Sequence, residues 1–240
     1  MKSFTINTRA SSNLFALTVI ALGATLLFTP RAGHTQEMQR GVSVQMPIAS
    51  NATAVPDADH NDAWVVAVTA DGSLYFGADP LTREALADWM KTHPRNREAK
   101  LYVKADARAP FASVEQVLEV GRRALFEAPV LLTSQREPVA AGTVMPPNGL
   151  EVQIAQLPAG AVATVVQLIN SGQQRPVLRV NGDEISWSGL EGTLRRHFQK
   201  GDEKMILLKA DQRLPFGQVV QVIDVCRSTG AKVFLPTPEL

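Results

Sequence analysis

Two short segments of the chain carry a lysine and an aspartate in the same arrangement. Lys104 and Asp106 end one apolar stretch, Lys209 and Asp211 end another, and each aspartate comes four residues before a proline. A carboxylate at such a place either binds a partner molecule or accepts N–H groups of its own turn, which is the more common role of a turn aspartate. These four residues are the candidate partner-binding residues of the sequence. Each lysine can pair with its aspartate or lie in solvent, and an exposed pair of this kind contributes under about 1 kcal/mol.

A second group of polar residues precedes the first predicted strand. Asp57, Asp59, His60 and Asp62 supply oxygen and nitrogen atoms at a density that could hold a divalent cation. The spacing fits no calcium-binding loop, and no bidentate glutamate follows. A solvated loop is therefore expected here, and no metal site.

Signatures of catalysis are missing from the sequence. The four histidines are scattered, and neither a nucleophile elbow, a phosphate loop nor a dinucleotide fingerprint occurs. Cys226 is the single cysteine, which excludes an internal disulfide and a cysteine-rich zinc site, and a small buried thiol is expected. The three tryptophans are expected in the core, because none lies in a basic segment. We expect neither an enzyme nor a cofactor.

Composition is that of an ordinary soluble globular chain. Of the 240 residues 45% are hydrophobic and 20% charged, and 24 basic residues balance 23 acidic ones to a net charge of +1. A chain of this length folds as one large domain or two small ones. The near-neutral charge argues against nucleic acid as a partner.

The chain repeats itself. Residues 101–122 (LYVKADARAPFASVEQVLEVGR) align without a gap with residues 206–227 (ILLKADQRLPFGQVVQVIDVCR), at an offset of 105. Upstream the agreement is looser, pairing residues 64–76 with 176–187, 81–89 with 190–198 and 41–47 with 149–155. The sequence therefore predicts module 1 at residues 41–134, a proline-containing linker at 135–148 and module 2 at 149–240.

The sequence of each module predicts six elements in the order strand, strand, helix, strand, helix, strand. In module 1 these are residues 64–68, 74–76, 81–92, 101–105, a helix opening at Pro110, and 130–132, with Asp71-Gly72 as the hairpin turn. In module 2 Asn181-Gly182 takes the turn's place, followed by residues 205–208, 215–228 and 232–235. Residues 162–169 have no clear partner in module 1 and fit either a helix or a strand. The expected fold class is α+β, with two helices on one face of a small mixed sheet in each module.

The first forty residues resemble an export segment. A basic start precedes the apolar residues 14–28, which as a helix reach about 22 Å, short of the roughly 30 Å hydrocarbon core. That length favours a cleaved signal peptide, whereas the absence of an Ala-x-Ala cleavage site leaves an uncleaved signal-anchor equally open. The remainder of the chain is exported in either case. The apolar run contains no ionisable side chain, so it should carry no protons itself.

The order of these short motifs resembles the ExbD/TolR family twice over. The motifs in module 1 are residues 41–47, Asp71-Gly72, Lys104-Ala105-Asp106, Phe111 and residues 130–133; those in module 2 are Asn181-Gly182, Lys209-Ala210-Asp211, Phe216, Arg227, Gly230 and residues 233–237. The resemblance implies an inner-membrane protein with one N-terminal helix and periplasmic modules. It implies a role in proton-motive-force-coupled transport beside an ExbB/TolQ-like protein, with a TonB/TolA-like protein or peptidoglycan as further partners.

The chain departs from the family pattern in two ways. The family's membrane helix carries an aspartate on the proton path, which residues 14–28 lack, and the family has one periplasmic module where this chain has two. A secreted periplasmic binding or scaffold protein without proton coupling is therefore the alternative function.

The duplication itself predicts an arrangement. Single-module members of the family work as homodimers, so the resemblance implies that the two modules pack against each other about an approximate two-fold axis. Module 1 has nine basic and twelve acidic residues, net −3, and module 2 has ten and nine, net +1. These charges weakly favour pairing between unlike modules.

Overall fold

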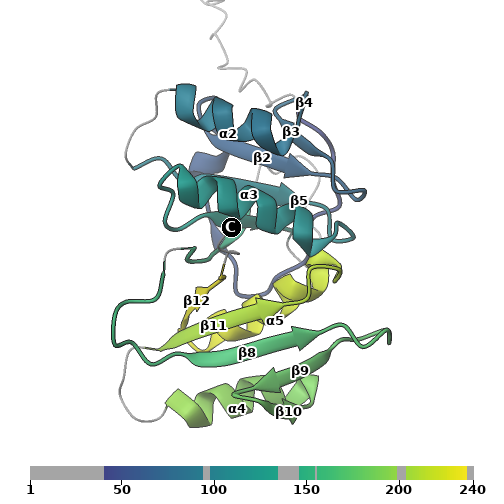
Figure 1. Ribbon diagram of the computed structural model, residues 1–240, viewed down its shortest axis with the longest axis vertical. Helices are drawn as coiled ribbons and strands as arrows, with labels where there is room; N and C mark the ends of the chain where they lie inside the picture. Colours follow the sequence, from purple (N-terminus) through teal and green to yellow (C-terminus); the bar gives the residue numbers. More distant parts are fainter. Residues whose placement is uncertain (1–40, 94–97, 135–145, 155, 199–203, 237–240) are drawn as a thin grey trace, which may run out of the picture. The chain divides into compact units, whose positions relative to one another are not determined.

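Two sheets with the same core topology make up the described part of the chain (Figure 1). The structure is a computed structural model, and it describes residues 41–93, 98–134, 146–154, 156–198 and 204–236. The first sheet has the strand order β1-β7-β6-β5-β2-β3-β4, and the second has the order β10-β9-β8-β11-β12. The predicted apolar helix at residues 14–28 lies outside the described residues.

Module 1 forms from these elements: β1 (Thr53–Ala54), the 3₁₀ turn η1 (Pro56–Asp59), β2 (Trp64–Val68), β3 (Leu74–Phe76), β4 (Asp79–Leu81), α2 (Arg83–Thr92), β5 (Leu101–Ala105), α3 (Phe111–Arg123) and β6 (Val130–Thr133). Thr82 caps α2 by accepting the Ala85 N–H, and Trp89 of the same helix packs on Trp64 of β2. Pro110, predicted as the first helical residue, is instead the N-cap of α3, which begins one position later at Phe111.

Module 2 forms from β7 (Asn148–Glu151), β8 (Thr164–Ile169), β9 (Val177–Val180), β10 (Asp183–Ile185), the 3₁₀ turn η2 (Trp187–Gly189), α4 (Leu190–His197), β11 (Met205–Ala210), α5 (Phe216–Ser228) and β12 (Lys232–Phe234). The sequence of residues 162–169 fitted either a helix or a strand, and the structure places strand β8 there.

The pairing of β8 corrects the predicted alignment of the two modules. β8 runs parallel to β11 and antiparallel to β9, as β2 runs parallel to β5 and antiparallel to β3. The counterpart of β2 is therefore β8, and the equivalence of residues 64–76 with 176–187 is wrong. Asn181-Gly182 joins β9 to β10, which makes it the counterpart of the Gly77 turn between β3 and β4. The alignment failed because both dipeptides suit a backbone with positive φ, which Gly72 (87°) and Asn181 (51°) adopt.

The expected α+β class is confirmed, with β2–β5–β6 and β8–β11–β12 parallel and the flanking hairpins antiparallel. In Figure 1, α2 and α3 lie in front of β2 and β5, whereas α5 lies behind β11. The opposite face of the first sheet buries Tyr102, Val130 and Leu132 against Ala58 of η1. Residues before β2 thus cover the face that the helices leave open.

The two modules contribute strands to one sheet and side chains to one apolar core. β7, from the start of module 2, pairs antiparallel with β6 and so extends the sheet of module 1. One continuous apolar cluster contains Val114 and Leu118 of α3 together with Val219 and Ile223 of α5. Residues Met38–Leu240 accordingly form one compact unit.

Candidate functional site

Asp106 is buried at the end of β5 and is fully engaged within the chain. Its carboxylate accepts the backbone N–H groups of Gln45 (3.0 Å) and Arg108 (3.0 Å), and the Arg108 side chain adds bonds of 2.8 and 2.9 Å. The Arg108 guanidinium and these N–H groups hold the pKa of the Asp106 carboxyl far below its usual range. The carboxylate therefore fixes the turn between β5 and α3.

Asp211 repeats this arrangement at the end of β11. It accepts the Arg213 N–H (2.9 Å) and two bonds from the Arg213 guanidinium (3.1 and 3.0 Å), which lower the pKa of the Asp211 carboxyl. Its side chain is 22% exposed, whereas that of Asp106 is 4% exposed. Among the ion pairs of the described residues, both aspartates pair with arginine, and Lys104 and Lys209 pair with neither. Arg108 and Arg213 were not among the predicted site residues, although they occupy equivalent positions of the repeat.

The two turns cross each other and hydrogen-bond reciprocally. Four backbone bonds join them: Phe111 N–H to Leu214 O (2.9 Å), Phe216 N–H to Ala109 O (2.8 Å), Ala112 N–H to Gln212 O (2.9 Å) and Gly217 N–H to Ala107 O (2.8 Å). Replacing each residue of one bond by its equivalent in the other module, 105 positions later or earlier, generates the mate of that bond. An antiparallel bridge joins the equivalent residues Pro110 and Pro215, so a local two-fold axis passes between them. The expected contact between the modules is present.

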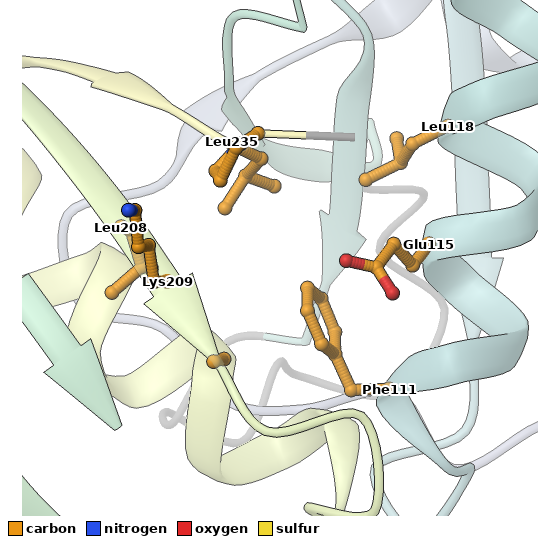
Figure 2. A pocket seen from close by; sticks show the side chains of 8 residues that line it. Phe111, Glu115, Leu118, Leu208, Lys209 and Leu235 are labelled. Atoms are coloured by element: carbon orange, nitrogen blue, oxygen red, sulfur yellow. The ribbon is translucent and has the colours of Figure 1, made fainter. Parts of the chain in front are cut away.

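A groove opens beside this crossing. It has a volume of about 250 Å³ and is lined by Phe111, Glu115, Leu118, Leu208, Lys209, Ala210, Leu235 and Pro236. Figure 2 shows Phe111, Glu115 and Leu118 reaching into it from α3, with β11 opposite and Leu235 at the end of β12. Of the four candidate binding residues, Lys209 lines the groove. Asp211 comes next in sequence after Ala210, which also lines it.

Charge at the groove comes from Glu115 and Lys209. Burial raises the pKa of the Glu115 carboxyl, which accepts a bond from the Gln212 side chain (2.8 Å). The walls around it are otherwise largely apolar. Such a surface suits the binding of a polypeptide or another partly apolar ligand. Sequence reasoning missed the groove because it forms between elements of different modules.

The other polar candidates stay apart from the groove. Asp57, His60 and Asp62 line a shallow hollow beside Tyr102, and no group of three or more His, Cys, Asp or Glu side chains in the described segments could hold a metal ion. Cys226 is buried in α5, and burial raises the pKa of its thiol to about 12. The thiol is therefore protonated at neutral pH, as expected for a packing residue.

Lys104 lies on the sheet of module 1, beside a second hollow of about 160 Å³ that Gly41, Val42 and Phe76 also line. It is half-buried, whereas Lys209 is exposed. The two lysines of the repeat therefore occupy different surroundings.

Comparison with known proteins finds one matching family. No curated protein matches the chain. Within the described ranges no helix is long and apolar enough to cross a membrane. The family model for biopolymer transport protein ExbD/TolR matches twice, at residues 26–136 and 137–237. With both modules matched in tandem, the chain belongs to the ExbD/TolR family.

Proposed function

We propose that the protein is an accessory of a proton-motive-force-coupled transport system of the ExbB–ExbD or TolQ–TolR type. It acts by binding proteins on the periplasmic side of the inner membrane. Membership of the family supports this role, and residues 14–28 supply the single apolar segment by which both modules would be attached.

The observation that carries the proposal is the reciprocal crossing of the turns before α3 and α5. Four backbone hydrogen bonds and a shared core join two family modules in one polypeptide. The chain thereby supplies in one copy the module pair that two single-module chains would form together. Its membrane partner is an ExbB/TolQ-like protein, and a TonB/TolA-like protein or peptidoglycan is contacted by the modules.

One sequence feature favours a second candidate function. Residues 14–28 contain no Asp, Glu, Lys, Arg or His, so this segment offers no group for a proton path. Under the first candidate the proton path lies in the partner. Under the second, the protein is a periplasmic scaffold without any part in proton coupling.

Co-purification separates the two candidates. The full chain is co-expressed with the ExbB/TolQ-like protein of its own genome and extracted in mild detergent. We expect the two proteins to elute together, and a variant beginning at residue 37 to lose the association. Recovery of a mature chain that begins near residue 36 from the soluble periplasm would overturn membrane attachment and favour the scaffold.

A further inference from the structure

Tyr102 of β5 is a buried tyrosine whose hydroxyl lacks a partner. Its side chain is 4% exposed and belongs to the small apolar cluster with Ala58, Val130 and Leu132. Within the described segments, no hydrogen bond reaches the Tyr102 hydroxyl. A buried polar group that lacks a partner destabilises a folded protein, and apolar packing does not explain its presence.

The repeat shows that the fold does not need this hydroxyl. In module 2 the equivalent residue of β11 is Leu207, an apolar side chain of similar place in the sheet. The segments before the counterpart strands β2 and β8 differ in the same way. Residues 55–63 contain three aspartates and a histidine, whereas the corresponding residues 155–163 contain no ionisable side chain. The hydroxyl and the carboxylates thus occur together in module 1 and are absent together from module 2.

The Tyr102 side chain reaches a hollow with acidic walls. The hollow has a volume of about 290 Å³, and Asp57, Asp62 and Lys100 line it together with Tyr102. Burial and the nearby Asp57 carboxylate raise the pKa of the Tyr102 hydroxyl, which therefore stays protonated at neutral pH. The hydroxyl oxygen keeps lone pairs that can accept a hydrogen bond.

The carboxylates of Asp57 and Asp62 are in no ion pair among the described residues. The lysine of the hollow does not neutralise them, because the Lys100 ammonium is bonded to the Glu151 carboxylate at 2.7 Å. The hollow therefore presents acceptor oxygens and negative charge, with its nearest cation engaged elsewhere.

A short turn fixes the acidic segment over Tyr102. Ala58, in the middle of η1, is buried in the same cluster as Tyr102. The His60 N–H donates to Asp57 O (3.2 Å), and the Ala63 N–H donates to His60 O (3.0 Å). Backbone bonds thus hold this turn, and the aspartate side chains remain available to a ligand.

We propose that this hollow binds a primary alkylammonium group, one per chain. The three N–H donors of such a group match three acceptors: the carboxylates of Asp57 and Asp62 and the Tyr102 hydroxyl. Its alkyl part lies against Ala63 and Ala99, which also line the hollow. The site is independent of the transport role and of the groove between the modules.

An organic cation fits the hollow better than a metal ion. No three or more His, Cys, Asp or Glu side chains of the described segments lie close enough to hold a metal ion. An ammonium group carries its own hydrogens, so its acceptors can stand further apart than the ligands around a metal ion. The alkylammonium group can belong to a free amine or to a lysine side chain of a protein.

Saturation-transfer NMR with butylamine and the full chain in a non-ionic detergent tests the site. We expect saturable binding, about millimolar in dissociation constant, because the carboxylates are exposed to solvent. High salt should weaken the binding, and butanol, which has the alkyl chain without the charge, should not bind. N-acetyl-lysine N-methylamide carries the same ammonium on a peptide unit. Equal binding of this compound supports a protein lysine as the ligand, whereas binding of butylamine alone supports a free amine.

Matched variants locate the ammonium. Asp57→Asn should weaken butylamine binding about tenfold, whereas Asp59→Asn, on the same turn but outside the lining of the hollow, should stay within about twofold of the wild type. Tyr102→Phe removes the hydroxyl and should also weaken binding, about fivefold, whereas Tyr75→Phe should leave it unchanged.

The stability of the ligand-free chain separates a binding hydroxyl from a structural one. Since Leu207 fills the equivalent place, Tyr102→Phe should unfold at the same urea concentration as the wild type or at a higher one. A lower midpoint would show that the hydroxyl has a partner within the chain and would overturn the proposal. Absence of butylamine binding to the wild type, or equal losses for Asp57→Asn and Asp59→Asn, would overturn it as well.

Discussion

At the scale of single residues, the repeated aspartates act on their own turns. Asp106 accepts four hydrogen bonds in a buried position, and Asp211 accepts three in a more exposed one. Their types and spacing were apparent from the sequence, and so was the turn role. The arginine partner was less apparent, because the preceding lysine offers the same charge.

The difference between the two aspartates predicts different stability effects. Asp106→Asn removes the charge that binds Arg108 and Gln45, and should lower the free energy of unfolding by about 1–3 kcal/mol at pH 7. Asp211→Asn, at the more exposed site, should cost less than half as much. Urea unfolding of the full chain measures both.

The pH dependence follows from the lowered pKa of Asp106. A carboxyl with a depressed folded-state pKa stabilises fully above its ordinary value of about 3.9, and this stabilisation is lost as the pH falls below it. The difference between wild type and Asp106→Asn should therefore shrink between about pH 4 and pH 3. A difference that stays constant down to pH 3 would contradict the assigned role.

At the scale of elements, strands with clear apolar runs were predictable to the residue. β2, β3 and β5 have the predicted bounds. β1, β4 and β7 were missed, because these are strands of two to four residues whose pairing partners, not their composition, make them strands. Residues 162–169 were ambiguous, since a short apolar run fits a buried helix as well as a strand.

The crossing of the turns depends on a small residue in α5. A Cβ on Gly217 would lie 3.1 Å from both Cβ and O of Ala107, and the backbone oxygen cannot easily move. Gly217→Val should therefore lower the free energy of unfolding by about 1–3 kcal/mol through overpacking of the crossing.

A helical glycine away from the crossing provides the control. A Cβ on Gly192 in α4 would meet nothing nearer than the Arg196 guanidinium at 3.6 Å, so Gly192→Val should change the stability by less than about 0.5 kcal/mol. Chemical denaturation of both variants tests the pair. Equal effects would show that the crossing does not contribute to stability.

At the scale of the whole molecule, the sequence predicted two modules in contact but not how they share structure. The repeat and its linker indicated the pairing. The insertion of β7 into the sheet of module 1 could not be predicted. Its partners in β6 lie 15 to 21 residues away in sequence, and the composition of a strand does not tell whether it pairs with a near or a distant strand. The groove went unseen for a similar reason: its walls, α3 and β11, are about 90 residues apart in sequence.

The shared structure predicts that the covalent linker is dispensable once the chain has folded. A protease site placed within residues 135–145 allows the folded full chain to be cut between the modules. The four reciprocal bonds, the β6–β7 pairing and the common core all remain after cutting. The halves should therefore elute together in size-exclusion chromatography under native conditions.

The linker should matter for reassembly rather than for the folded contact. While the halves are tethered, their effective concentration is on the order of millimolar, and after cleavage it falls to the concentration of the sample. Unfolding of the cut chain should therefore become concentration-dependent, with a midpoint that falls on dilution, whereas that of the intact chain stays constant. Gly217→Val, which strains the crossing, should enlarge this dependence. If the cut halves separate without denaturant, the modules are independent domains, and only the covalent linker holds them together in the intact chain.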